Sequence, residues 1–264
     1  MQNSEDSLVE RKSNAVPWTI QETWYGIIFT LIPWVVLAIG LSQLGQGKAS
    51  QNNSPLSFQA DLVSAIIVFV VSCVIEGAFL IAPLYIANKA FRSIIPHFRL
   101  ALRALGLRDF NVRRSLVLVV ILLIAILAID NLYQYVITVL HLNLQTNDQV
   151  LLQRSKIAPI STYATLLAAV FVAPFCEEIF FRGFVFPGLS KAMPAGWAIV
   201  SSSLIFALAH ADPGSFAVLF IIGLALAFLR WRTKSLWPCI FLHLLNNGLG
   251  ALLIILVMQG IVKP

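Results

Sequence analysis

The sequence is poor in charged residues. They make up 11% of the 264 positions, while hydrophobic types make up 59%. A soluble domain carries about a quarter charged residues. The mean hydropathy of +0.86 points the same way. This composition excludes a water-soluble globular domain and indicates that most of the chain is solvated by a lipid bilayer.

Cysteine is scarce as well. Cys73, Cys176 and Cys239 all lie in apolar segments and show no Cys-x-x-Cys spacing. This arrangement argues against a disulfide framework or a cysteine-based zinc site. The polar stretch 1–19 also lacks the short apolar core and small-residue cleavage site of a signal peptide. We therefore expect the first apolar run to be a retained membrane helix.

Apolar runs of about 20 residues, long enough to cross a bilayer core of about 30 Å, recur along the chain. They cover 24–41, 62–86, 115–140, 161–187, 196–210, 215–229 and 236–258. This pattern predicts an all-α fold, a polytopic transmembrane helical bundle of about seven spans. No room is left for a large soluble appendage.

The net charge of +6 does not indicate nucleic acid, because the basic residues cluster between the apolar runs, as the positive-inside rule describes. The segment 89–114 has one acid, Asp109, and seven basic residues: Lys89, Arg92, Arg99, Arg103, Arg108, Arg113 and Arg114. It is either an amphipathic segment on an anionic leaflet or a plain basic loop. Both interpretations mark the cytoplasmic side. With Arg11 and Lys12, they predict a multi-pass protein of the cell membrane with a cytoplasmic N-terminus.

Several ionisable residues interrupt the apolar runs, at a cost of about 2.5–3.5 kcal/mol each on insertion scales. They are Glu76, Asp130, Glu177, Glu178, Arg182, His210 and His243. Such residues face the bundle interior and usually mark function. Glu76 and Asp130 stand alone in their runs, so their role stays open between a polar helix contact and catalysis.

Two adjacent carboxylates form the strongest signal. Glu178 and Arg182 are four residues apart and share one helix face, so they can pair. Glu177 is rotated by about 100° and has no obvious local partner. A buried, unpaired carboxylate can exchange protons near neutral pH. The pattern therefore favours Glu177 as a general base over a surface salt bridge.

Polar residues in two later runs complete the candidate set. His210 ends the run that contains Phe206, and His243 and Asn247 lie four apart on one helix face. Such a His/Asn face can donate to an oxyanion, and two histidines with a carboxylate can hold zinc. A polar contact between helices is the plain alternative. Spacing alone does not choose among the three.

The motifs occur in a fixed order: Glu-Glu-x-x-x-Arg at Glu177, Glu178 and Arg182, Phe-x-x-x-His at Phe206 and His210, and His-x-x-x-Asn at His243 and Asn247. Together they resemble the CAAX prenyl protease type II family, also called the CPBP or Abi family. The resemblance covers about 158–258. It predicts that 1–114 is a polar tail, two variable membrane helices and a basic amphipathic loop. The catalytic membrane core is then 115–264.

This resemblance implies an α-helical intramembrane endopeptidase. It implies that Glu177 activates the attacking water with help from His210, and that His243 and Asn247 stabilise the oxyanion. Supporting roles fall to Glu178, Arg182 and Phe206. Members are often called metalloproteases, so Zn²⁺ on Glu177, His210 and His243 stays an open hypothesis. The sequence departs from the family's usual pattern at Ala211-Asp212, directly after His210.

The expected partners are the lipid bilayer and a membrane-associated peptide or protein, prenylated or not. Two other functions stay open. One is a non-proteolytic protein of the same fold, such as a bacteriocin-immunity or scaffolding factor. The other is a proton-coupled transporter using Glu76, Asp130 and Glu177, although the sequence shows no inverted repeat of the kind that transporters carry.

The candidate residues lie at unequal depths. Ideal straight spans would place Glu177, His210 and His243 about 10 Å apart along the membrane normal. We therefore expect kinks or helix ends near the prolines at positions 174, 187 and 213. These should bring the three residues and Asn247 to one polar cavity within the membrane, open toward the cytoplasmic side.

Overall fold

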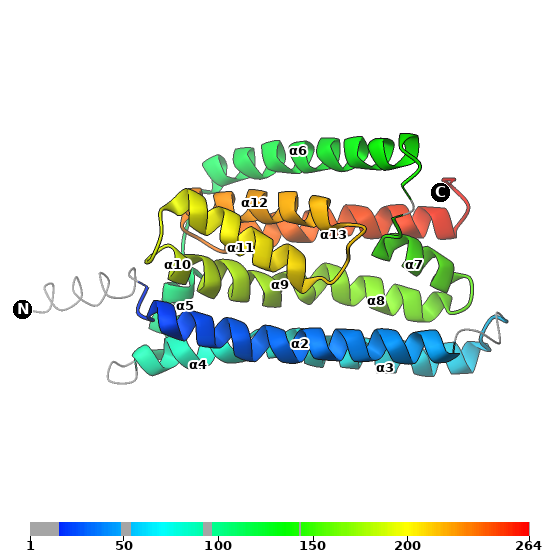
Figure 1. Cartoon of the computed structure of the whole chain (residues 1–264), viewed down its shortest axis with the longest axis horizontal. Helices are drawn as coiled ribbons and strands as arrows, with labels where there is room; N and C mark the ends of the chain where they lie inside the picture. The colour runs from blue at the N-terminus through cyan, green and yellow to red at the C-terminus, as the bar shows by residue number, and fades with distance from the viewer. Residues whose placement is uncertain (1–15, 49–53, 92–96, 143, 264) are drawn as a thin grey trace, which may run out of the picture.

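The computed structural model describes residues 16–48, 54–91, 97–142 and 144–263, and in these ranges the regular structure is helical (Figure 1). In chain order the helices are α2 (Ile20–Lys48), α3 (Phe58–Ala78), α4 (Ile81–Ala90), α5 (His97–Leu105), α6 (Val112–Val139), α7 (Asn147–Ser155), α8 (Pro159–Phe171), α9 (Ala173–Glu178), η1 (Ile179–Val185), α10 (Phe186–Leu189), α11 (Ala195–Ala209), α12 (Phe216–Thr233) and α13 (Trp237–Met258). The predicted all-α membrane bundle is confirmed.

Six helical segments in the described ranges are long and apolar enough to cross a membrane, so the chain is an integral, multi-pass membrane protein. The predicted fifth span is different, because α11 has only 15 residues and reaches about 22 Å. The predicted second span is divided between α3 and α4, and the fourth among four consecutive segments. In Figure 1 the connection between α11 and α12 lies part-way along the bundle, short of the end where α7 lies.

The basic segment between the second and third spans contains a helix, α5. It buries Leu100, Ala101, Ala104 and Leu105 against the protein and exposes Phe98 and Arg99. This one-sided burial supports the amphipathic interpretation over a plain loop. The predictions made for Arg11, Lys12 and Arg92 concern residues outside the described ranges.

Side-chain caps fix several helix starts. Asn111 accepts from the backbone N–H of Arg114 at the start of α6, and Thr146 with Gln149 forms a capping box at α7, a helix that the sequence did not predict. The start of α8 is capped from another helix. Asp61 of α3, 2% exposed, accepts from the N–H groups of Ile160 at 2.7 Å and Ser161 at 3.0 Å. This cap ties α3 to α8, which pack along each other.

Candidate active site

The fourth span is broken where the carboxylates lie. Helix α8 ends at Phe171, α9 carries Glu177 and Glu178, and the next seven residues form the π-helix η1. Pro174 stands at the beginning of α9, as the predicted kink requires. π-Helical turns are rare in proteins, and those that do occur are frequently found at functional sites. The irregular backbone therefore coincides with the predicted chemistry.

Two distant side chains complete the hydrogen bonding of the π-helix. Arg230 Nε donates to the carbonyl of Arg182 at 3.1 Å, and Trp18 Nε1 donates to the carbonyl of Phe184 at 3.3 Å. A buried carbonyl without a partner is costly, so these donors stabilise the wide turn. Neither role was predicted from the sequence, because nothing in the spacing identifies the partner of an irregular carbonyl.

Glu178 is the centre of a buried ionic network and is fully buried. Arg182 Nη1 donates to its Oε1 at 2.8 Å, and His243 Nδ1 lies 3.0 Å from the same oxygen. Arg182 also donates through Nη2 to the carbonyl of Gly223 at 3.2 Å. The predicted pair between Glu178 and Arg182 is confirmed. Its extension to His243 ties the fourth span to α13.

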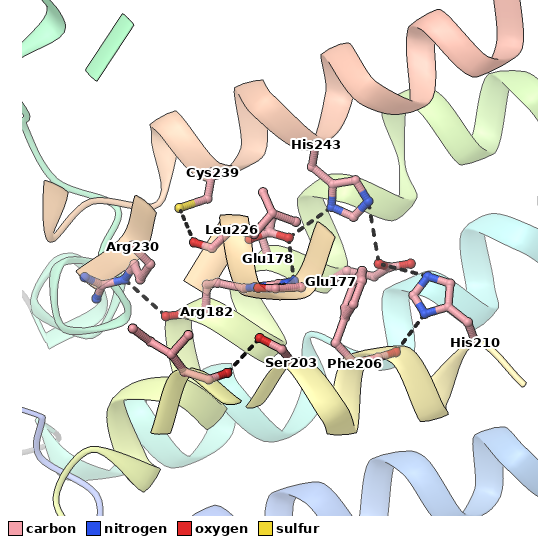
Figure 2. A network of polar contacts seen from close by, with 12 residues as sticks. Glu177, Glu178, Arg182, Ser203, Phe206, His210, Leu226, Arg230, Cys239 and His243 are labelled. Carbon is pink, nitrogen blue, oxygen red and sulfur yellow. Dashed lines mark hydrogen bonds and ion pairs between the residues drawn. The ribbon is translucent and has the colours of Figure 1, made fainter. Parts of the chain in front are cut away.

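Glu177 faces the two histidines. Its Oε2 lies 3.9 Å from Nε2 of His210 and 4.0 Å from Nε2 of His243. Figure 2 shows both rings beside this carboxylate. Among the described residues, Oε2 has no hydrogen-bond partner, although Glu177 is only 8% exposed. The predicted convergence of these three residues is confirmed.

The Nδ1 atoms of the two histidines are each held by a hydrogen-bond acceptor. His210 Nδ1 lies 2.8 Å from the carbonyl oxygen of Phe206, which can only accept, so Nδ1 carries the proton. His243 Nδ1 is held in the same way by Glu178. In the neutral rings both Nε2 atoms then present lone pairs toward Glu177. Three acceptors surround one small space, and this arrangement suits a hydrogen-donating molecule or a cation.

The distances between these side chains test whether they could hold a zinc ion. The donor types fit, since two neutral imidazoles and a carboxylate are zinc ligands. The spacing does not fit. A tetrahedral zinc holds nitrogen and oxygen ligands about 3.4 Å apart, and the described ranges contain no His, Cys, Asp or Glu group arranged to hold a metal ion. A water with hydrogen bonds of about 2.8 Å spans 3.9–4.0 Å readily.

Asn247 lies one helical turn beyond His243 on α13. Its Nδ2 donates to the carbonyl of Ala169 on α8 at 3.0 Å, and Asn246 donates to its Oδ1 at 3.4 Å. One hydrogen of the Asn247 amide is therefore engaged by the backbone. The other hydrogen is the group that a substrate could use.

Aromatic side chains hold the histidines in place. The Phe206 ring contacts His210 with centroids 4.5 Å apart and His243 at 5.9 Å, and the Arg182 guanidinium lies 4.3 Å from its centroid. Trp34 of α2 donates through Nε1 to the carbonyl of Ala209 at 2.7 Å, directly before His210. Phe206 was predicted as a supporting residue. Trp34 was missed, because it lies in the part of the chain that the motifs do not cover.

The turn that carries His210 is fixed from its other side. Ala211 has a positive φ of 49°, and Asp212, 6% exposed, accepts from the N–H groups of Asn147 at 3.1 Å and Ser215 at 3.1 Å. The Ala211-Asp212 departure from the family pattern thus has a structural role here. It anchors the α11–α12 connection to the start of α7.

Glu76 is another acid of the site region that spacing did not identify. Its Oε2 is buried and has no hydrogen-bond partner in the described part of the chain. Its charge interacts with that of Glu177, and α3 packs against α9. Asp130 differs, because its hydrogen bond to Gln134 lies within α6 and not between helices. The signal available in the sequence was that Glu76 is the sole charge in its apolar run.

The predicted polar cavity stays a prediction. Two apolar grooves of about 420 and 500 Å³ lie between α2 and the α3–α4 pair, and neither is lined by Glu177 or the two histidines. The His210 side chain is 26% exposed, whereas that of His243 is 4% exposed. His210 is therefore the more accessible of the two rings.

Comparison with known proteins finds similarity over the segment that carries this site. Residues 159–249 match the family model described as type II CAAX prenyl endopeptidase Rce1-like. The protein "Putative membrane peptidase YdiL" of Bacillus subtilis (strain 168) is 34% identical over 101 residues, 38% of this chain and 40% of that protein. An "Uncharacterized protein" of Mycoplasma capricolum subsp. capricolum is 31% identical over 162 residues, 56% of this chain and 47% of that protein. No solved structure matches.

The matched segment contains all three motifs and the whole Glu177–His210–His243 arrangement. The predicted resemblance to the CAAX prenyl protease type II family is confirmed over this segment. The matches cover less than half of the length of either relative.

Proposed function

We propose that the chain is an intramembrane endopeptidase in which Glu177 activates a water molecule. The observation that carries this proposal is the unpartnered Oε2 of Glu177, 3.9 Å and 4.0 Å from two imidazole nitrogens of fixed orientation in the described part of the chain. A water in that space can donate to Glu177 and to one imidazole Nε2. That is the arrangement that a general base requires.

The proposed reaction is ordinary peptide hydrolysis. Glu177 takes a proton from the water, and the water oxygen attacks the carbonyl carbon of the substrate. The C–N bond then breaks, and the proton passes to the leaving amine from Glu177, with His210 assisting. One water is consumed, and one carboxylate and one amine are released, so no further reactant is needed.

The proposed oxyanion donors are His243 and Asn247. His243 Nε2 can donate only when the ring is doubly protonated, and its Nδ1 is held by the Glu178 carboxylate. Asn247 offers its remaining amide hydrogen. Donors fixed before the reaction stabilise developing charge most effectively. The buried pair of Glu178 and Arg182 therefore has a positioning role.

We infer the orientation and the substrate class from the chain itself. The end of the bundle with α4 and α5 also holds the α12–α13 connection, and there the described basic residues concentrate (Figure 1). That end is assigned to the cytoplasm of the cell membrane. The substrate is a peptide segment of a membrane-associated protein. Nothing in the site requires a prenyl group.

The test compares Glu177→Gln with the matched control Asp130→Asn, each of which replaces one acid by its amide within an apolar span. Purified protein in nanodiscs is given a panel of peptides, prenylated and not. We expect the Glu177 variant to lose turnover by about 10²–10⁴-fold, since that is the contribution of a general base, while Asp130→Asn cleaves normally. Wild-type turnover by Glu177→Gln contradicts the mechanism.

The panel also separates the alternative functions. Absence of cleavage by a folded wild-type protein for every peptide favours the non-proteolytic scaffold. Uptake of protons into sealed vesicles, lost in Glu76→Gln, favours the transporter. Stoichiometric zinc in the wild type that is lost in His210→Ala would mean that the attacking water is bound to a metal ion.

A further inference from the structure

Packing shields the candidate site from one end of the bundle, the end that holds α4, α5 and the α12–α13 connection and is here called the basic end. Every residue from 176 to 189 is buried, and this stretch runs from the carboxylates toward the basic end (Figure 1). Glu178, Arg182 and Phe206 are fully buried. Figure 2 shows Arg182 on the side of Glu177 that faces the basic end. Glu177 is therefore shielded on that side.

Exposure is greater on the other side of the site. The His210 side chain is 26% exposed, and it ends α11 at the point farthest from the basic end. Asn246 and Asn247 follow His243 by about one turn on α13 and are half-buried. Helices α11 and α13 both run away from the basic end (Figure 1). The more accessible residues of the site therefore lie toward the end where α7 is placed.

The connection between α11 and α12 lies within the depth of the membrane. Helix α11 begins near the basic end, and its 15 residues reach about 22 Å, which is less than a hydrocarbon core of about 30 Å. Ala211 and Pro213 of the connection are exposed and lie outside any helix. Exposed irregular backbone at this depth is tolerated only where it lines a water-filled space, because lipid cannot satisfy its polar groups. The connection is therefore expected to meet water.

Helix α7 adds polar surface beside this connection. The N–H of its first residue, Asn147, donates to Asp212 of the connection at 3.1 Å, so the start of α7 lies against it. Most of the polar side chains of α7 are exposed: Asn147, Asp148, Gln149, Gln153 and Arg154. Charged and polar side chains are costly in hydrocarbon. The surroundings of α7 are therefore aqueous, in agreement with the exposed connection next to it.

We propose that water and substrate reach Glu177 from the α7 side, opposite the basic end. With the basic end in the cytoplasm, the site faces the non-cytoplasmic side of the membrane. Its substrates are then peptide segments that membrane-associated proteins expose on that side. This inference rests on the proposed function and on the proposed orientation. It runs against the cytoplasmic opening predicted from the sequence, because apolar periodicity did not reveal that α11 ends within the membrane.

Two exposed alanines on either side of α11 give a matched test. Ala211→Cys places a thiol beside His210, and the control Ala192→Cys places one in the turn before α11, at the basic end. A membrane-impermeant maleimide is applied to intact cells and to inverted membrane vesicles, with the wild-type chain as the blank for its own three cysteines. We expect Ala211→Cys to be labelled in cells and Ala192→Cys only in inverted vesicles. Melting temperatures show that both variants are folded.

Labelling needs no turnover, so it separates this inference from the proposed function. Label on Ala211→Cys only in inverted vesicles would overturn the proposal, because the opening would then be cytoplasmic. Absence of label on the folded variant from both sides would also overturn it, since the connection would not meet water. Label on both variants from the same side would remove the contrast on which it depends.

Turnover adds a second measurement. Labelled Ala211→Cys should lose cleavage of peptides supplied from the non-cytoplasmic side, because the label obstructs the approach to His210, while labelled Ala192→Cys keeps it. Unchanged cleavage by fully labelled Ala211→Cys would mean that substrate enters elsewhere. The expected labelling without any cleavage by the wild type would contradict the proposed function and leave the aqueous opening supported.

Discussion

The fourth span and α6 have similar lengths, of 31 and 28 residues, yet they fold differently. The segment Pro159–Leu189 has 56% of its most apolar window buried inside the protein, whereas Val112–Val139 has 17%. Helix α6 is one continuous helix on the outside of the bundle (Figure 1). The fourth span is broken, contains a π-helix and buries an ion pair. Hydropathy therefore identifies what crosses the membrane, and burial of charge identifies the candidate site.

The outward face of α6 shows what a span needs when it only meets lipid. Its side chains Leu116, Val117, Ile121 and Ile124 are exposed to the outside of the protein. Such residues need no specific partner, because lipid tails are as apolar as the side chains. Changes there should be tolerated, and changes in the fourth span should not be.

The largest expected effect comes from Arg182→Met in the fourth span. It leaves the fully buried Glu178 carboxylate without its cation, at a cost of about 3–5 kcal/mol in the free energy of unfolding. Denaturant titration in mixed micelles measures this. The double variant with Glu178→Gln should recover much of the loss, because no unpaired charge remains. An unchanged midpoint for Arg182→Met alone would argue against a buried pair.

The second effect concerns the start of the fourth span. Asp61→Ala removes the cap from the N–H groups of Ile160 and Ser161 and should lower the free energy of unfolding by about 2 kcal/mol. Asp61→Asn keeps an acceptor and should cost less. Both are read from the same titration. Equal losses in the two variants would show that charge, and not the acceptor, stabilises the helix start.

A smaller effect is expected at Trp34, which holds the turn before His210. Trp34→Phe removes one hydrogen bond to the Ala209 carbonyl and should cost about 1 kcal/mol. Turnover should also fall, because His210 is less well positioned. Trp197→Phe is the matched control, since Trp197 on α11 is 66% exposed. Equal changes in stability and turnover in the two variants would mean that Trp34 does not position His210.

The smallest effect is expected in α6. Asp130→Asn retains the oxygen that accepts from Gln134 at 3.5 Å, so the free energy of unfolding should change by less than about 0.5 kcal/mol. The same titration checks it. A large loss of stability would show that α6 also depends on a specific polar contact. The two spans would then not differ in this respect.

The sequence predicted the bundle, the Glu178–Arg182 pair and the meeting of Glu177 with two histidines. These follow from hydropathy, from four-residue spacing and from the motif set. The roles of the individual residues, and Zn²⁺ as a cofactor, stay predictions. The division into 1–114 and 115–264 also stays untested, although Trp18 and Trp34 from the first part contact the second.

What the sequence could not supply depends on tertiary contact. The π-helix is not encoded by a local pattern, because its carbonyls rely on Trp18 and Arg230 from distant segments. Glu76 appeared as an isolated acid until α3 was placed beside α9. The shortness of α11 follows from the positive φ at Ala211, which apolar periodicity does not reveal.

The geometry of the site depends on the number of residues in the π-helix. A π-helical turn contains more residues for its rise than an α-helical one. Deleting a single residue between Ile179 and Val185 would let the segment wind as an α-helix and would remove the wide turn whose carbonyls accept from Arg230 and Trp18. Homologous chains that differ freely in length at the 190–194 connection should therefore all keep the same number of residues across η1.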